Sequence, residues 1–253
     1  MQASPILASM KTIAIVPCFN VADVLEKTIA AIPEGTFEKV LIIDDHSTDG
    51  TADVAHRLGL EVIRHPENRG YGGSQKSGYR EAIQQGYDAV VMIHGDNQYD
   101  PAISPQFVQK LHEGFDVATG TRMVLGDALK NGMPMWKFIP NRLLTWLENT
   151  AFQTSLSDYH NGYRAFTTTF LRKVPLELLS DKFDFDTDIM IQAAIRKARI
   201  AEIPHSTRYN LENSQMPFSK GVVYGLSILR TVSAYLLHQC HIRRTPLFEP
   251  RQA

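Results

Sequence analysis

The chain has 253 residues, of which 43% are hydrophobic, and a formal net charge of -1. A chain of this length and apolar content can bury the core of one large α/β domain. The balanced charge argues against a nucleic-acid-binding protein, because such proteins usually carry a basic surplus that attracts phosphates. We therefore expect a protein that acts on small molecules and has no nucleic-acid partner.

The cysteines and the first residues bear on where the protein works. Cys18 and Cys240 are too few and too far apart in sequence for a disulfide framework or a paired zinc motif. The opening residues MQASPILASMKT lack the long apolar segment of a secretory signal. Both features predict a cytoplasmic location.

The first half of the chain alternates between short apolar runs and stretches with a helical period. Unbroken Val/Ile runs followed by helices are typical of parallel strands that are covered on both faces. The pattern therefore predicts an α/β fold with a Rossmann-like, mostly parallel central sheet flanked by helices. Strands are expected at 12–17, 39–45, 61–65 and 89–96, and helices at 22–32, 51–59 and 76–86.

The second half is less regular. A further strand ends just before Arg122, and the Gly- and Met-containing stretch 123–137 is predicted to form a flexible loop over a ligand crevice. Helices are expected at 142–153 and 186–198, and a late strand at 201–209.

The C-terminal segment is predicted to be an amphipathic helical tail at 211–253, following a domain at 1–210. Its apolar stretch is interrupted by Arg230 and ends in basic residues, so it is too charged to predict a membrane span. Two interpretations stay open. The helix packs on its own domain, or it lies on the inner face of the cell membrane with Arg230, Arg243 and Arg244 against anionic headgroups. The apolar helix could also pair two copies of the chain.

Polar side chains follow several predicted strands. Asp44 and Asp45 come after the second strand, and Asp96 and Gln98 after the fourth. The carboxyl ends of parallel strands border the ligand crevice in such sheets. Oxygen ligands of this kind suit Mg²⁺ or Mn²⁺, which usually also bind substrate phosphates. With Arg122 after a further strand, they indicate a substrate that carries a diphosphate.

The glycine-rich segment RGYGGSQKS, residues 69–77, nearly matches a phosphate-binding P-loop. It lacks the glycine before Lys76 and does not follow its strand directly, and it also fails the dinucleotide-binding pattern. What remains is a glycine-rich turn that enters a helix, where Arg69 and Lys76 could face an anion, or else a plain loop.

Six segments together resemble a known family: IVPCFN, IIDDHSTDGT, NRGYGGSQKSGYREA, HGDNQYDP, GTR and SDYHNGYRAF. In this order they are similar to the family-2 glycosyltransferases with the GT-A fold, and within them to the dolichol- and polyprenyl-phosphate mannose and glucose synthases. The resemblance implies that a sugar is transferred from a nucleotide diphosphate donor, with inversion at the anomeric carbon and with Mg²⁺ or Mn²⁺ holding the diphosphate.

The resemblance also assigns the donor side of the site. It gives Pro17 and Asp45 to the pocket of the base and ribose. The full set expected to bind the nucleotide sugar is Pro17, Asp44, Asp45, Arg69, Gly70, Lys76, Asp96 and Arg122.

Asp96 and Gln98 match the second acid and the glutamine of the family's D-x-D-x-Q stretch, and His94 replaces its first acid. The metal is therefore expected either to take the His94 imidazole or to be held by Asp96, Gln98 and the diphosphate alone. A neutral imidazole suits Mn²⁺ better than Mg²⁺.

On the acceptor side, the resemblance places Asp158 and Arg164 near the sugar. A hydroxyl acceptor would need a carboxylate such as Asp158 to take its proton, whereas an anionic phosphate would instead need cations, for which Arg164 and Arg208 are the candidates. Asp186 is a further catalytic candidate, although charge near a helix start is a sufficient structural reason for it. His160 either lines the acceptor pocket or is simply packed.

The expected activity is thus an inverting transfer of a hexose from a UDP- or GDP-sugar to a polyprenyl phosphate or a related lipid. The alternatives are a soluble or polysaccharide acceptor, or a catalytically silent protein that binds nucleotide sugars, for which only His94 argues.

Overall fold

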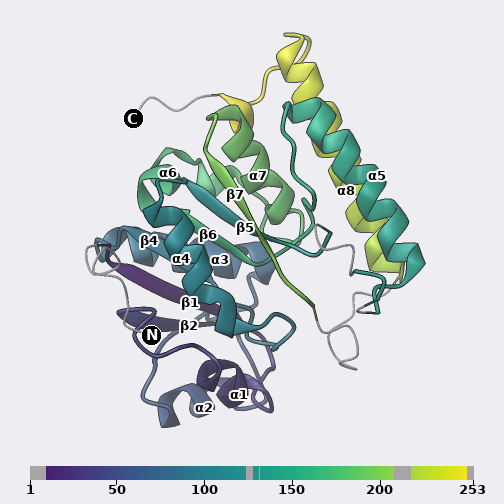
Figure 1. Cartoon of the computed structure of the whole chain (residues 1–253). Coiled ribbons are helices and arrows are strands. Elements are labelled where there is room, and N and C mark those ends of the chain that lie inside the picture. The colour runs from purple at the N-terminus through teal and green to yellow at the C-terminus, as the bar shows by residue number, and fades with distance from the viewer. Residues whose placement is uncertain (1–9, 124–127, 131, 208–217, 250–253) are drawn as a thin grey trace.

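The computed structural model describes residues 10–123, 128–130, 132–207 and 218–249, with only the backbone described for 218–220 (Figure 1). The strands in this part of the chain are β1 Thr12–Cys18, β2 Lys39–Asp44, β3 Glu61–Arg64, β4 Ala89–Met92, β5 Val117–Thr121, β6 Arg164–Thr167 and β7 Ile200–Pro204. They form one sheet in the order β3-β2-β1-β4-β6-β5-β7.

Six of these seven strands run in the same direction. β1 pairs in parallel with β2 and β4, β2 with β3, and β5 with β7, while β6 is antiparallel to both of its neighbours, β4 and β5. The prediction of a mostly parallel central sheet is confirmed. The strand predicted at 201–209 is shorter than expected, because β7 ends at Pro204.

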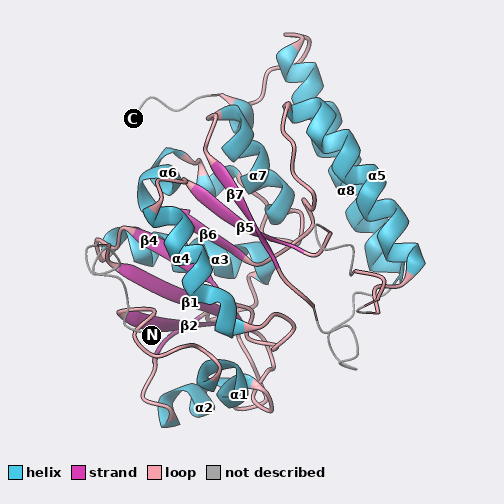
Figure 2. Cartoon of the chain, viewed as in Figure 1, coloured by secondary structure: helices cyan, strands magenta, loops and turns pink. Residues whose placement is uncertain are grey.

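Helices cover both faces of the sheet (Figure 2). They are α1 Leu25–Ala30, α2 Thr51–Arg57, α3 Gly70–Gln84, α4 Ser104–His112, α5 Met135–Phe152, α6 Thr168–Lys173, α7 Phe185–Ile195 and α8 Phe218–Gln239, with short 3-10 turns at Pro101–Ile103, Leu176–Leu178 and Pro246–Phe248.

The two faces follow from the period-two alternation of the strands. In β1, Ile13 and Ile15 belong to the core cluster formed with α3, α6 and α7, whereas Ala14 and Val16 belong to the cluster formed with α1, α2 and α4. All four side chains are fully buried. Burial on both faces is why β1 has the unbroken apolar sequence from which it was predicted.

Two helices begin earlier than the hydrophobic pattern predicts. α3 begins at Gly70, so the glycine-rich segment is the first part of the helix rather than a turn before it. A Cβ at Gly72 would lie 2.4 Å from the carbonyl oxygen of Ser180, so glycine lets α3 pack closely there. α5 begins at Met135, inside the predicted loop 123–137, and tolerates Pro140 near its start.

The C-terminal helix α8 lies alongside α5 (Figure 1). Its Ile228 and Val232 are buried in the same core cluster as Ile13 of β1, as is Phe248 beyond the helix. The predicted domain boundary at residue 210 lies outside the described residues. No described helix is long and apolar enough to cross a membrane.

Candidate active site

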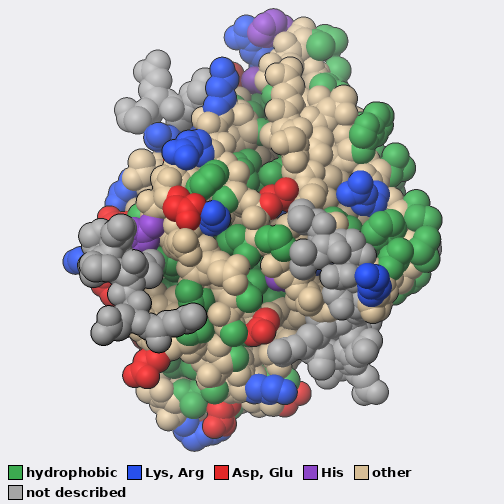
Figure 3. All heavy atoms as spheres, in the orientation of Figure 1, with side chains coloured by type: hydrophobic (Ala, Val, Ile, Leu, Met, Phe, Trp, Pro, Cys, Tyr) green, Lys and Arg blue, Asp and Glu red, His purple; other side chains and the backbone are tan. Residues whose placement is uncertain are grey.

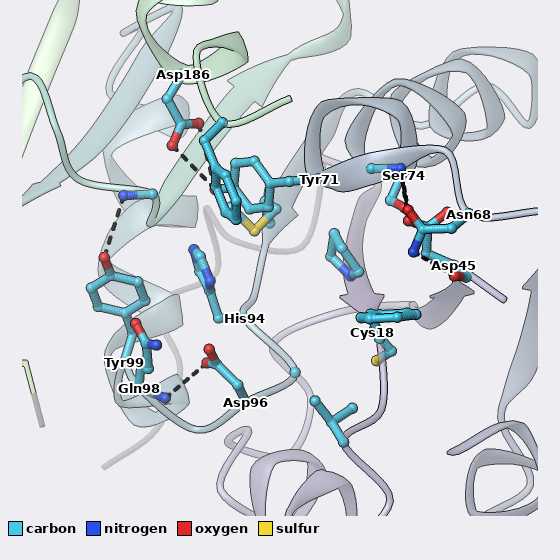
Figure 4. Close-up of a pocket in the computed structure, with 18 of the residues that line it drawn as sticks. Cys18, Asp45, Asn68, Tyr71, Ser74, His94, Asp96, Gln98, Tyr99 and Asp186 are labelled. Carbon is cyan, nitrogen blue, oxygen red and sulfur yellow. Dashed lines mark hydrogen bonds between the residues drawn. The ribbon is translucent and has the colours of Figure 1, made fainter. Parts of the chain in front are cut away.

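The carboxyl ends of the central strands border a cavity of about 710 Å³ (Figure 4). Because β1 lies between β2 and β4, residues that follow β2 and β4 approach the cavity from two sides of Pro17 and Cys18. Of the predicted site residues, those that line it are Pro17, Asp45, Gly70, His94, Asp96, Gln98, His160 and Asp186. Those that do not are Asp44, Arg69, Lys76, Arg122, Asp158 and Arg164, and Arg208 lies outside the described residues.

The Asp45 carboxylate binds the N-terminus of α3. Its two oxygens accept hydrogen bonds from the backbone N–H groups of Arg69 and Gly70, each at 2.8 Å, and the Nδ1 of His65 lies 2.7 Å from Oδ1. A negative charge is favoured at this end of a helix dipole. Gly70 has a φ of +82°, a conformation that glycine adopts without strain. Asp45 thus fixes α3 against the end of β2 and borders the cavity.

The remaining groups at the start of α3 are also occupied, which corrects the expectation of an open anion site. The carbonyl oxygen of Asp181 accepts hydrogen bonds from the N–H groups of Gly72 and Gly73 at 2.9 and 3.2 Å. The Nζ of Lys76 is buried and donates to the carbonyl oxygen of Leu179 at 2.8 Å, and it lies 2.5 Å from the Asp181 carboxylate. Lys76 therefore ties α3 to the segment before α7 and does not reach the cavity.

The Asp44 carboxylate makes contacts that hold the backbone near the end of β2. It is fully buried, its Oδ1 accepts a hydrogen bond from the Ser47 N–H at 3.1 Å, and its Oδ2 lies 3.1 Å from Nε of Arg64. These contacts hold the turn after β2 and the neighbouring strand β3, and Asp45 alone of the two acids borders the cavity.

His94, the residue that replaces an acid in the resemblance, is held between two aromatic rings. Its ring centroid lies 4.6 Å from that of Tyr99 and 5.9 Å from that of Tyr71. Its Nε2 is buried without a hydrogen-bond partner, and a Cβ at Gly162 would lie only 2.5 Å from this atom. Glycine at 162 thus makes room for the imidazole at the cavity wall.

Asp96 and Gln98 supply the oxygen donors beside it. Both line the cavity, and the Gln98 N–H donates to Oδ1 of Asp96 at 3.1 Å across Asn97, whose φ is +59°. Among the described residues, no group of three or more His, Cys, Asp or Glu side chains is arranged to hold a metal. One carboxylate and one amide fit an Mg²⁺ or Mn²⁺ ion that takes its other oxygens from a substrate diphosphate.

Asp158 lies beside the cavity in a buried ion pair with Arg122. Nε and one terminal nitrogen of Arg122 donate to its two oxygens at 2.7 and 2.9 Å, and Asn141 and the His160 N–H donate at 3.0 and 3.1 Å. Burial alone would raise the pKa of Asp158. The Arg122 charge and these hydrogen bonds outweigh burial and hold that pKa well below its ordinary value. Asp158 is therefore a weak proton acceptor.

Arg164 is buried beneath the cavity rather than inside it. One terminal nitrogen donates to the backbone oxygen and to Oδ1 of Asp186, both at 2.9 Å, and the other donates to the Tyr159 carbonyl at 2.7 Å. The Tyr71 hydroxyl donates to Oδ2 of Asp186 at 3.2 Å. Asp186 is thus the member of this group that faces the cavity, and both of its oxygens have protein partners.

His160 joins the cavity to the two outer helices. Its Nδ1 lies 3.2 Å from the hydroxyl of Tyr224 on α8, which also lines the cavity. Its Nε2 lies 3.2 Å from Oε2 of Glu148 on α5, a fully buried carboxylate.

The sequence analysis misses Tyr71, Glu148 and Tyr224. Glu148 carries a signal that could have been used, because it is a charged residue on the buried face of α5, between Thr145 and Phe152 at helical spacing. Tyr71 and Tyr224 stand in segments whose pattern gives no such sign.

Comparison with known proteins identifies the family of the chain. The sequence model of the family described as glycosyl transferase family 2 matches residues 13–177. The chain belongs to glycosyl transferase family 2. It is 30% identical over 221 residues to an uncharacterized protein of Methanocaldococcus jannaschii, covering 85% of this chain and 88% of that one. It is 27% identical over 225 residues to undecaprenyl-phosphate mannosyltransferase of Micrococcus luteus, covering 85% and 90%.

Solved structures confirm the GT-A fold expected for a family-2 glycosyltransferase. Glucosyl-3-phosphoglycerate synthase from Mycobacterium tuberculosis, in complex with Mn²⁺, UDP-glucose and phosphoglyceric acid, superposes with a TM-score of 0.70 at 20% identity. The similarity covers 94% of this chain and 82% of that one. The protein is therefore a family-2 glycosyltransferase with the GT-A fold.

Proposed function

We propose that the protein transfers a hexose from a UDP- or GDP-sugar to a polyprenyl phosphate, with inversion at the anomeric carbon. A phosphate oxygen of the acceptor attacks that carbon, the new C–O bond forms opposite the old one, and the nucleoside diphosphate leaves with the electrons of the broken bond. The similarity to undecaprenyl-phosphate mannosyltransferase supports a lipid-phosphate acceptor. Such an acceptor would place the enzyme at the inner face of the cell membrane.

The observation that carries this proposal is that the two predicted catalytic carboxylates are already paired with arginines. Asp158 and Asp186, the predicted catalytic acids, are each paired with an arginine, Arg122 and Arg164. The low pKa of Asp158 makes it a poor base for a hydroxyl acceptor. A phosphate is already anionic near neutral pH and needs no base, so this site suits a phosphate acceptor better than a hydroxyl.

The cavity wall formed by His160 and Tyr224 is the proposed acceptor subsite. The Tyr224 hydroxyl could donate to a phosphate oxygen, and Nδ1 of His160 lies 3.2 Å from this hydroxyl and would orient it. Asp45, which also lines the cavity, is left for the base and ribose of the donor.

Asp96 and Gln98 would hold the divalent ion. The ion would supply charge that offsets the negative charge on the departing diphosphate. The Asp96 carboxylate lines the cavity, where it would also orient the donor. His94 lines the cavity next to it, between the rings of Tyr71 and Tyr99.

A soluble phosphorylated acceptor is the second candidate. The structure with TM-score 0.70 holds phosphoglyceric acid, which carries a phosphate, and the low pKa of Asp158 is equally compatible with such an acceptor. The lipid acceptor is preferred because of the similarity to undecaprenyl-phosphate mannosyltransferase, which covers 85% of this chain and 90% of that one.

Donor binding is tested by a thermal-shift panel of UDP, GDP and their hexoses, each with Mn²⁺, Mg²⁺ or a chelator. A ligand that binds only the folded protein at about 100 times its dissociation constant adds about 2.7 kcal/mol to the free energy of unfolding. We expect one nucleotide series to raise the melting temperature by several degrees, and to do so less in chelator. If no nucleotide raises the melting temperature, the protein does not bind a donor by itself and the proposed function is contradicted.

A further inference from the structure

α5 exposes a stripe of apolar side chains on its outer surface. The stripe recurs every three or four residues, which places it on one face of the helix. Its exposed members are Met135, Trp136, Ile139, Leu143 and Trp146, of which Leu143 and Trp146 are 61% and 63% exposed. Large apolar side chains gathered in this way mark an interaction surface more often than a plain solvent surface.

α8 exposes a matching stripe. Its exposed apolar residues are Val222, Val223, Leu226, Leu229, Leu236 and Leu237, with Val223 at 68% and Leu226 at 60%. The opposite side of the helix carries the buried residues Ile228 and Val232, so α8 packs on its own domain and also keeps an apolar outer face.

The two helices that carry these stripes adjoin each other. Trp136 lies against Gly221 at one end of the helix pair, and the Phe152 and Tyr235 rings pack edge to face toward the other. The helices therefore run side by side in the same direction (Figure 1). We name their exposed residues the α5/α8 face.

The exposed charged side chains described on α5 and α8 themselves are basic, and the exposed acid Glu249 lies beyond α8. α8 contains no Asp or Glu, and the sole acid of α5, Glu148, is fully buried. Arg142, Arg230, Arg243 and Arg244 are all exposed on or just beyond the two helices. In Figure 3, the hydrophobic side chains along the outer edge of α5 have Lys and Arg side chains beside them.

We propose that the α5/α8 face docks the enzyme on an anionic membrane surface, with the apolar side chains inserted among the lipids and the arginines against the headgroups. Apolar residues with tryptophans, rimmed by cations, are the composition of helices that lie in a membrane interface. The proposal deepens the proposed function and rests on it for the identity of the acceptor.

A second copy of the chain fits this face less well. A two-fold interface brings the same surface against itself, so arginines would face arginines with no exposed acid on either helix to pair with them. An anionic lipid surface supplies the missing negative charge. This charge complementarity decides between the two occupants.

The α5/α8 face also lies next to the cavity. Tyr224 lines the cavity, while its neighbour Val223 and the next-turn residue Leu226 are exposed on the α5/α8 face. One turn of α8 thus contacts both the cavity and the outer surface. A lipid whose chain stays in the membrane could present its phosphate to His160 and Tyr224 from this side.

The test is co-sedimentation of the full chain with vesicles of phosphatidylglycerol and phosphatidylcholine that contain neither polyprenyl phosphate nor donor. Removing α8 would delete the buried residues Ile228 and Val232 and expose the core that they cover, so surface substitutions are used instead. We expect the wild type to bind, with weaker binding at high salt and to pure phosphatidylcholine. The double variant Leu143→Ser/Leu226→Ser should lose at least about tenfold in partitioning.

Leu178→Ser is the matched control, because Leu178 is 46% exposed on a different segment and undergoes the same chemical change. It should bind vesicles as the wild type does. Equal binding by the double variant, or no binding by the wild type, would overturn the proposal. So would a solution dimer, measured by analytical ultracentrifugation, that the double variant dissociates. Because no substrate is present, these results are independent of whether the transferase activity is as proposed.

Discussion

Asp96→Ala is expected to lower kcat for sugar transfer by at least about a hundredfold while the protein stays folded. Asp96 is the carboxylate at the β4 end of the cavity, and its expected role is to hold the divalent ion that offsets charge on the leaving diphosphate. Removing one preorganised electrostatic group from such a site typically costs about 10² to 10³ in kcat. The measurement is the initial rate with saturating donor and Mn²⁺.

The control for this variant is Asp23→Ala, which removes a carboxylate exposed in the loop before α1. It should leave the rate unchanged. The melting temperature of Asp96→Ala should stay close to that of the wild type, because within the described part of the chain the Asp96 side chain accepts one hydrogen bond, from the nearby N–H of Gln98. An active Asp96→Ala enzyme would remove Asp96 from the metal site.

Asp188→Asn is expected to stabilise the protein at pH 8 and to change little at pH 4.5. Asp188 lies in the first turn of α7 and is 6% exposed. Burial, with the Asp184 charge adding to it, raises the pKa of its carboxyl to about 7, although the hydrogen bond from the Ser180 N–H, at 2.9 Å, and the Lys76 charge oppose the rise. The folded protein therefore keeps a proton on Asp188 that the unfolded chain loses near pH 4.

The sign of the effect follows from the protons bound. Between about pH 4 and pH 7 the folded state holds one more proton than the unfolded state, so the free energy of unfolding of the wild type falls as pH rises through this window. Three units of pKa correspond to about 4 kcal/mol, and asparagine has no such proton to lose. Urea unfolding should therefore show Asp188→Asn to be more stable than the wild type by about 2–4 kcal/mol at pH 8.

Asp53→Asn serves as the comparison, because Asp53 is an exposed acid in the first turn of α2. It should show no gain at pH 8. If Asp188→Asn has the same stability as the wild type at both pH values, the Asp188 carboxyl titrates normally and its burial carries no penalty.

The central part of the fold could be predicted because its burial leaves a clear pattern. Strands buried on both faces have uninterrupted apolar sequences, and the polar residues Asp45 and Asp96 directly after them mark the edge that borders the cavity. The antiparallel strand β6 leaves no such pattern. It has four residues, the first three of which end the segment SDYHNGYRAF, so nothing in the sequence separates it from a loop.

The errors at the site have a common cause, which is that sequence spacing does not give the direction of a side chain. Lys76 follows the glycines as an anion-binding lysine would. Because α3 begins six residues earlier, Lys76 points toward Leu179 and Asp181 instead. The pair Arg122–Asp158 joins residues 36 positions apart, and only the fold brings them together. The partners of Lys76 hold it away from the cavity, whereas the roles predicted for Arg122 and Asp158 stay predictions.

The most direct test of the proposed function is to detect the product. The enzyme is incubated with UDP- and GDP-hexoses, Mn²⁺ and either a polyprenyl phosphate in vesicles or 3-phosphoglycerate, and the products are identified by mass spectrometry. We predict a polyprenyl phosphate that has gained one hexose, and its loss with Asp96→Ala. A hexose on 3-phosphoglycerate alone, or transfer only to an acceptor that carries no phosphate, would contradict the proposed lipid-phosphate acceptor.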